Sequence, residues 1–470
     1  MIHVLAIVVF MAVLMRDAVP RAVWFDRLGP WWAAGLTLGA MAAILAVGHV
    51  GCRLASRRLD RVTWRFWLRW SERMAIGSRL AIVAVHLASV FVLGWVDAVR
   101  VVVPDGFAAD ELVAAAPAIL AMIATWASWY PVERWVRTQE LLPELDRGLP
   151  VYGPPTRGEF VLGMVRHQLA IVVAPIAVIT IWGELVESAV RVVAVDGGGR
   201  DVEFVQASGI AAQLVGIAAI FGLMPIVLCR VWDTVRLRGG ELRDQLMNVC
   251  ARHNVRVRDL LIWRTHGTMV NAAVLGFVPR LRYILVTDSL LDRLGWPQVE
   301  AVMAHEIGHV RHHHMAWLAT SLIGTVMLVG ACTWWATGWL GVAGDARYGD
   351  VAVSAVSLAA GLVVFGFVSR IFERQSDAFA ARHLSDASAT ITATAAMTMI
   401  EALEAVAMGN RVAQSRWTWR HGSIDQRIDH LRGLVGADAT AMRIDRRVRF
   451  VKMMVSLLAF AGVGATMLIA

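Results

Sequence analysis

The sequence contains little charge and almost no lysine. Charged residues make up 17% of the 470 positions and hydrophobic residues 57%, with a mean hydropathy of +0.58. These values lie outside the range of soluble globular domains and indicate a membrane protein. Lys452 is the single lysine among 45 basic residues, so the formal charge of +8 comes from arginine. Basic residues in a membrane protein mark loops on one side of the bilayer, and we predict no nucleic-acid partner.

Cysteine is also scarce. The four cysteines, Cys52, Cys229, Cys250 and Cys332, are widely spaced, and none belongs to a CxxC pair. This spacing predicts neither a disulfide framework nor a thiolate zinc site. We expect buried, inert thiols.

Long apolar runs recur along the whole chain. A bilayer core requires about 20 mainly apolar residues per helix. Eight runs meet this requirement, at approximately 31–51, 80–96, 112–131, 168–186, 207–229, 316–343, 351–369 and 450–470. A ninth run, Met1–Met15, is short for a span, but it lacks the basic start and cleavage site of a signal peptide. We therefore expect a retained helix there.

Arginine alternates between the connecting segments. The 53–79 segment carries eight arginines, whereas 97–111 has only Arg100 among several acids. By the positive-inside rule, the segments 53–79, 133–167, 230–315 and 370–449 are predicted to be cytoplasmic.

The stretch AVMAHEIGHVRHHHM, residues 301–315, contains the HExxH pattern. Pro297 suits the first turn of a helix, on which His305 and His309 at i and i+4 project from one face towards one cation. This arrangement predicts two zinc ligands, with Glu306 as the general base. The alternative is that these are polar residues at the mouth of the span that follows.

A catalytic zinc site needs three protein ligands and one open position. Three ligands on consecutive turns of one straight helix would spread over about 11 Å, so the third ligand must come from another element. We expect His312, His313 and His314 to lie at the helix end and membrane surface. The segment SRIFERQSDAFAARH, residues 369–383, offers Glu373 as the third ligand and Asp377 one turn later to orient a histidine. The hairpin of spans 316–369 returns the chain so that these groups can meet.

At this point the sequence resembles the M48 family of membrane zinc metallopeptidases, which includes Ste24 and HtpX. The resemblance covers about residues 235–435. VEAVMAHEIGHVRHHH is similar to the family's active-site helix, and SRIFERQSDAFAARH is similar to its ExxxD helix, which implies Glu373 as ligand and Asp377 as its support. NAAVLGFVPRLRYILVTDSLLDRL resembles the family's strand pair and implies that Asn271 lies beside bound peptide. WRHGSIDQRIDHL resembles a segment in which proline follows a histidine, but Gly422 replaces that proline after His421.

The residues flanking the pattern support a small sheet. VRDLLIW, VNAAVLGF and RYILVTDSLL are β-branched runs of strand length, separated by basic or glycine-containing turns. An edge strand beside the metal could hold an extended substrate through backbone hydrogen bonds. Asn271 could equally be a turn residue at a strand start. We further expect His421 or Arg427 to stabilise the oxyanion that develops during attack by a zinc-bound water.

The resulting prediction is a mostly α polytopic membrane protein with about eight to nine transmembrane helices and a small cytoplasmic α+β zincin-like domain. Residues 1–230 would form an N-terminal membrane region with basic cytoplasmic loops, 231–450 a metalloprotease region interrupted by the hairpin 316–369, and 451–470 a C-terminal span. We expect one Zn²⁺ per chain, a gluzincin-type endopeptidase of polypeptides or membrane proteins, and residence in a bacterial cytoplasmic membrane with the active site facing the cytoplasm. Quality control of membrane proteins is the favoured task.

Four other functions remain open. A CaaX-type processing protease would require prenylated partners. An intramembrane site-2-type protease would need HExxH within an apolar span and a later LDG motif, which the sequence lacks. A BlaR1-type sensor would need a large extracytoplasmic domain. A metal-binding scaffold without catalysis would need neither Glu306 nor the remote Glu373.

Overall fold

The computed structural model describes residues 2–18, 26–27, 29–59, 63–103, 108–146, 148, 151–196, 202–339, 349–386, 388–440 and 442–468. The chain forms two compact units, Met1–Trp232 and Asp233–Ala470. The predicted end of one span at 340–343 lies outside the described residues, as do the last two residues of the predicted C-terminal span.

Eight helices of the described chain are long and apolar enough to cross a membrane, in agreement with the eight predicted runs. The first unit holds five of them, at Pro30–Arg57, Trp64–Leu93, Ala109–Leu141, Arg157–Val193 and Phe204–Val231, and the second holds His314–Trp339, Ala352–Leu384 and Arg443–Met467. The N-terminal run forms the shorter helix Ile2–Leu14. The fold is therefore mostly α and polytopic, as predicted.

The first unit is entirely helical over its described residues. Its elements are α1 (Ile2–Leu14), η1 (Arg16–Ala18), α3 (Pro30–Arg57), α4 (Trp64–Ala88), η2 (Ser89–Leu93), α5 (Trp95–Arg100), α6 (Ala109–Asp146), α7 (Arg157–Met164), η3 (Val165–Leu169), α8 (Ala170–Asp196) and α9 (Val202–Val231). Its core includes Ile82 and Met122. Most of the connecting segment 53–79 is helical, because α3 and α4 extend well beyond their apolar runs.

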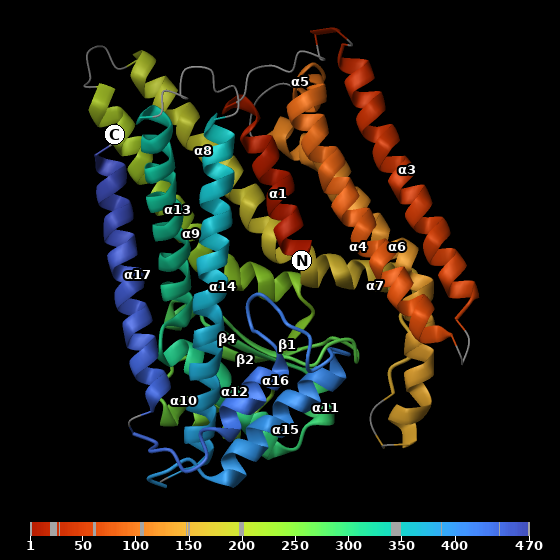
Figure 1. Ribbon diagram of the computed structural model, residues 1–470, viewed down its shortest axis with the longest axis vertical. Helices are drawn as coiled ribbons and strands as arrows, with labels where there is room; N and C mark the ends of the chain where they lie inside the picture. Colours follow the sequence, from red (N-terminus) through yellow and green to blue (C-terminus); the bar gives the residue numbers. More distant parts are fainter. Residues whose placement is uncertain are drawn as a thin grey trace. The chain divides into compact units, whose positions relative to one another are not determined.

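The second unit combines a four-stranded sheet with eight helices in its described residues (Figure 1). Its strands and short turn are β1 (Thr234–Arg236), β2 (Asp259–Trp263), β3 (Ala272–Leu275), η4 (Pro279–Leu281) and β4 (Tyr283–Thr287). Its helices are α10 (Glu241–Arg252), α11 (Asp288–Arg293), α12 (Trp296–Arg311), α13 (His314–Trp339), α14 (Gly349–Leu384), α15 (Ala393–Gly409), α16 (Ile424–Arg432) and α17 (Arg443–Met467).

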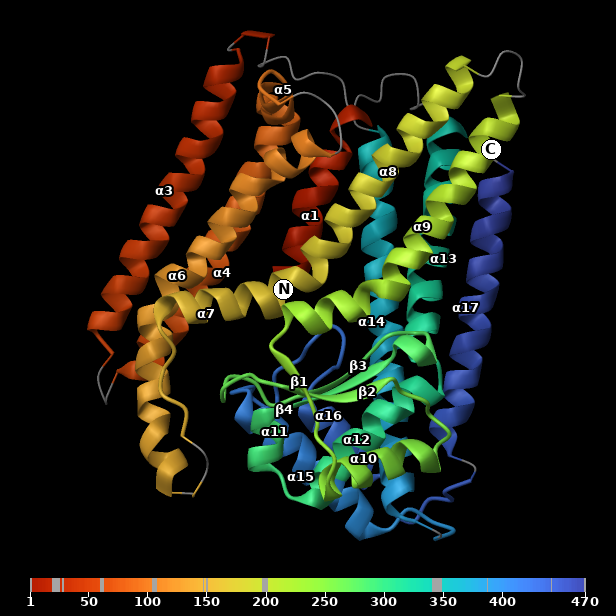
Figure 2. The same ribbon diagram turned by 180° about the vertical axis from the view of Figure 1, so that it is seen from behind.

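The sheet has the strand order β1-β2-β4-β3 (Figure 2). β2 and β4 are parallel, and the edge strands β1 and β3 are antiparallel to their neighbours. Three of these strands fall on the predicted β-branched runs. β1 was not predicted, because it is only three residues long and contains an arginine. The core between sheet and helices includes Leu260, Ile284 and Ile307.

Helices α13, α14 and α17 lie side by side and extend away from the sheet (Figures 1 and 2). Glycine permits the close crossing of α13 and α17. A Cβ on Gly324 would lie 2.8 Å from the Cα of Ala459, and a Cβ on Gly462 would lie 2.8 Å from the carbonyl oxygen of Gly324. Small residues at such crossings let membrane helices approach one another closely.

The four cysteines are unpaired. Cys52 and Cys250 are buried, as expected, whereas Cys229 is partly exposed and Cys332 is exposed. The expectation is wrong for Cys332 because its thiol lies on an outer face of the candidate span α13, where the apolar surroundings would be lipid rather than protein.

Candidate metal centre

The HExxH residues lie in the last turns of α12. Gly295 precedes the helix, and Pro297 occupies its first turn, where no intrahelical N–H bond is required. A Cβ on Gly308 would meet the ring of Phe379 at 3.2 Å, so this glycine allows α12 to pack closely on α14. His305 and His309 consequently face α14.

Glu373 and Asp377 lie on α14, which continues from the candidate span without interruption. Both side chains are buried, together with Phe372 and Ala378. Two carboxylates in such an apolar setting require partners. The partners come from α12 and from the segment that follows α15.

Three side chains converge on one point. Nε2 of His305 lies 3.2 Å from Nε2 of His309, and Glu373 oxygens lie 3.6 Å from the first and 3.7 Å from the second. Tetrahedral bonds of about 2.0–2.1 Å place ligand atoms about 3.4 Å apart. Two imidazoles and one carboxylate are also a donor set of catalytic zinc, so these residues fit Zn²⁺.

A second group within the described residues could also hold a cation. Asp110, Glu111 and Glu184 of the first unit have oxygens within 4.8 Å of one another. It contains only carboxylates, and Arg100 already binds Asp110 at 2.6 Å. Its ligand chemistry does not resemble a zinc site.

Asp377 orients the first histidine from behind. Its Oδ1 lies 2.9 Å from Nδ1 of His305, which directs Nε2 towards the ligand point. Burial opposes the charged imidazolium, but the hydrogen bond and charge of Asp377 outweigh it and raise the pKa of His305. Burial lowers the pKa of His309 to about 3, which keeps that ring neutral.

Arg427 supports the two acids. It donates two hydrogen bonds to Asp377, at 2.8 and 2.6 Å, and its Nη1 lies 3.4 Å from Glu373. Burial favours its neutral form, yet the two carboxylates raise its pKa overall. The arginine is 9% exposed, and its position suits the holding of both acids better than the substrate contact predicted from the sequence.

Glu306 lies between the metal ligands and the edge strand β3. Burial raises its pKa to about 7, while the backbone N–H of Val274 acts in the opposite direction. A carboxyl group with this pKa can both accept and return a proton near neutral pH.

His421 reaches the site from a turn between α15 and α16. Its Nδ1 lies 2.9 Å from Oε1 of Glu373, and 47% of its side chain is exposed. Gly422, which stands in the place of the family's proline, has φ +75°. Proline cannot adopt this angle, so the turn of this chain presents its histidine through a different backbone conformation. Arg370 of α14 steadies the turn by donating to the carbonyl oxygen of Trp419.

Asn271 lies at the exposed start of β3, and its backbone pairs with Thr287. Asn410 was not predicted as part of this region. Its side-chain oxygen accepts from the N–H of Val270 at 3.0 Å, and its NH₂ group donates to the C=O of Val270 at 2.7 Å. Asn410 thus closes the outer edge of the sheet just before β3. No signal in the sequence identified it.

The three histidines after HExxH do not share one environment. Helix α12 ends at Arg311, and His313, at φ +55°, is exposed. His314 is fully buried, which corrects the expectation that it lies at the surface. The left-handed residue His313 turns the chain so that the ring of His314 returns beside His309.

Two histidines of an HExxH helix and a glutamate from a second helix thus form a group that could hold a metal ion, in a chain with eight candidate spans. Residues 237–435 match the model of peptidase family M48.

Two relatives illustrate the similarity. The protease HtpX homolog of Aeropyrum pernix is 40% identical over 121 residues, which is 24% of this chain and 37% of that protein. The protease HtpX homolog of Thermoplasma acidophilum is 28% identical over 186 residues, or 37% of this chain and 57% of that protein. The matches thus cover less than two thirds of these relatives.

The crystal structure of S. mikatae Ste24p aligns with 85% of this chain and 98% of its own, at 12% identity and a TM-score of 0.46.

Proposed function

We propose that this chain is a membrane-embedded zinc endopeptidase. The observation that carries the proposal is the convergence of His305, His309 and Glu373 to within 3.7 Å of one another, with Glu306 on the same helix as the two histidines. The match to peptidase family M48 supports it.

These three residues would hold the metal, which when bound lowers the pKa of water and polarises a peptide carbonyl. Glu306 accepts the proton of the attacking water and delivers it to the departing amine. Its buried position favours this exchange, because burial brings its pKa to about 7. Asp377 and Arg427 keep His305 and Glu373 in place.

His421 is the group best situated to stabilise the oxyanion. Its ring is about half exposed and lies against Glu373, so one nitrogen is held by the carboxylate while the other can donate to substrate. Arg427 acts with it only indirectly, because its guanidinium is engaged with Asp377 and Glu373.

The substrate would bind as a strand along β3. Thr287 donates to the carbonyl of Asn271, so that this residue pairs inward with β4. In an antiparallel ladder the alternate residues Ala272 and Val274 then direct their N–H and C=O groups outward. Asn410 closes the edge at Val270, and Glu306 lies at Val274. An extended peptide would therefore pair with a short stretch immediately beside the base.

We place the centre on the cytoplasmic face of a bacterial inner membrane, because arginine is concentrated in the segments 230–315 and 370–449. We propose quality control of misfolded membrane proteins as the task. The relatives are named protease HtpX homologs, which supports the protease part of this proposal.

The test compares the full-length wild type with Glu306→Gln in detergent and in liposomes. Cleavage of casein and of an unfolded membrane protein should require zinc, stop with a chelator and fall at least about a thousandfold in Glu306→Gln, while zinc binding persists. Glu401→Gln, on the exposed face of α15, is the matched control and should cleave normally. Normal proteolysis by zinc-loaded Glu306→Gln would refute the assignment of the base.

A further inference from the structure

A row of buried and half-buried polar side chains leads away from His309 on the side opposite the ligand point. Nδ1 of His309 lies 3.0 Å from Nδ1 of His314, and Nε2 of His314 lies 2.8 Å from Oε1 of Gln375. Nε2 of Gln375 then donates to Oδ1 of Asp445 at 2.7 Å. These four residues come from α12, α13, α14 and α17.

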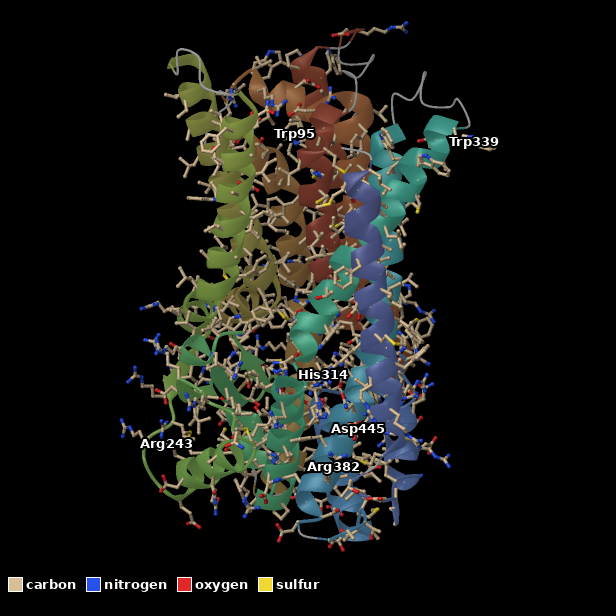
Figure 3. The ribbon with its side chains drawn as sticks, turned by 90° about the vertical axis from the view of Figure 1, so that its left-hand side faces the viewer. Trp95, Arg243, His314, Trp339, Arg382 and Asp445 are labelled. Carbon is tan, nitrogen blue, oxygen red and sulfur yellow. The ribbon has the colours of Figure 1, made fainter. Side chains whose placement is uncertain are left out.

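The end of this row determines where its protons lie. The other oxygen of Asp445 accepts a hydrogen bond from Arg382 at 2.8 Å, so the carboxylate acts as an acceptor at both oxygens. Gln375 must therefore direct its NH₂ group towards Asp445 and its carbonyl oxygen towards His314. Figure 3 labels His314, Arg382 and Asp445 in this region.

The hydrogen position on His314 determines that on the candidate metal ligand His309. Since Oε1 of Gln375 only accepts, Nε2 of His314 carries the hydrogen, and Nδ1 of the neutral ring is a bare acceptor. Ser376, whose Oγ lies 3.4 Å from that Nδ1, can also donate to it. His309 must then carry its hydrogen on Nδ1, which leaves the lone pair of Nε2 facing His305 and Glu373.

The ring of His314 is also fixed in its plane. Phe372 stacks on it with centroids 4.2 Å apart and an interplanar angle of 9°, and the ring of His312 lies nearly parallel at 5.6 Å. A ring stacked in this way is held in the plane in which Nδ1 faces His309 and Nε2 faces Gln375. Its position depends on the left-handed conformation of His313.

We propose that His314 is a positioning residue for the metal centre. Directed by Gln375 and Asp445, it accepts the Nδ1 hydrogen of His309 and so selects the tautomer whose Nε2 binds zinc. Asp377 does the same for His305, and each histidine ligand therefore has its own orienting partner. This inference rests on the proposed zinc site and extends it to the transmembrane helix α17.

The experiment measures zinc affinity of the full-length chain in detergent by competition with a chromophoric chelator. His314→Phe preserves the stacking but removes the acceptor, and it should weaken zinc binding about ten- to a hundredfold. His314→Asn places an amide oxygen near the position of Nδ1 and should restore part of this loss. Asp445→Asn frees the amide of Gln375 to turn and should give a smaller loss. Met315→Phe, at the exposed next position of α13, is the matched control and should bind zinc as the wild type does.

A second readout is the tautomer of His309, followed by ¹⁵N NMR of histidine-labelled protein. The wild type should show Nδ1 protonated, and His314→Phe should show a mixture. Absence of zinc binding by the wild type would overturn both the proposed function and this inference. Tight binding that is equal in the wild type, His314→Phe and Asp445→Asn would overturn the inference alone. If His314→Phe does not fold, the zinc affinities of His314→Asn and Asp445→Asn still decide between these outcomes.

Discussion

Asp377 contacts both the candidate ligand His305 and the buried Arg427. Its Oδ1 faces Nδ1 of His305 while both oxygens accept from Arg427. The carboxylate is completely buried, so that removing its charge leaves Arg427 with no equivalent acceptor. One residue therefore controls the orientation of a ligand histidine and the position of the arginine that contacts Glu373.

We predict that Asp377→Asn lowers zinc affinity about ten- to a hundredfold, because an amide orients His305 more weakly and repels the guanidinium through its own N–H groups. Chelator competition on the full-length chain measures this change. Asp429→Asn, an exposed position on α16, makes the same substitution away from the site and should have no effect. Equal affinities for the two variants would exclude an orienting role for Asp377.

The sequence predicts that His305, Glu306, His309 and Glu373 lie in one site. Helix periodicity places the first three on neighbouring turns, and the hairpin returns the chain so that Glu373 can reach them. The sequence could not predict His314 as a neighbour of His309. Five residues along a continuous helix rotate the side chain by about 140°, away from the face of His309. The left-handed conformation of His313 interrupts the helix and turns His314 back towards His309. No sequence pattern predicted this conformation. Gln375 and Asp445 depend in turn on the position of His314.

Helices α13 and α17 cross where both have glycine. We predict that Gly462→Val forces α17 away from α13, since its added carbons would meet the backbone of Gly324, and that it destabilises the chain by about 1–3 kcal/mol. Thermal unfolding in detergent reports this change. Gly464→Val on the same helix is the control, because nothing lies within 4 Å of that position. A similar shift in melting temperature for both variants would argue against close packing at the crossing.

If the substrate binds as a strand along β3, it must pair with the outward N–H and C=O groups of this edge strand, and a proline substitution can remove one of them. Ala272→Pro removes an N–H that faces away from β4, which the sheet tolerates at an edge. We expect KM for a peptide substrate to rise about three- to tenfold through loss of one hydrogen bond, with little change in melting temperature. Ala273→Pro removes an N–H directed at β4 and should instead unfold the sheet. If Ala272→Pro leaves KM unchanged, the substrate does not pair at this residue.

Apolar runs predicted the helices better than they predicted the helix ends. The run 351–369 lies within α14, which extends from Gly349 to Leu384 without a break. Likewise, α6 extends from Ala109 to Asp146, well beyond the run 112–131. Hydropathy marks the part of a helix that lipid can cover, whereas backbone hydrogen bonds continue through charged turns. This continuity is what carries Glu373 and Asp377 rigidly from the span to the centre.

The second unit is joined by polar contacts as well as by its core. His253 at the end of α10 packs on Phe379 of α14, with ring centroids 4.6 Å apart. Its Nε2 lies 2.9 Å from Nδ1 of His383, whose Nε2 lies 3.2 Å from Glu300 of α12. Three helices thus meet through polar side chains.

We predict that acid weakens this junction. Burial, followed by the nearby His383, lowers the pKa of His253 from the ordinary 6.5 to about 4. Below pH 6.5 the unfolded chain therefore takes up a proton that the folded chain refuses until about pH 4, so the free energy of unfolding falls across this interval. Melting temperatures of the zinc-free chain in detergent should decrease from pH 7 to 4.5, and His253→Phe, which keeps the packing on Phe379, should reduce that decrease. Met315→Phe, an exposed substitution on α13 that changes no titratable group, should retain the wild-type profile; identical profiles for all three proteins would show that His253 does not link folding to pH.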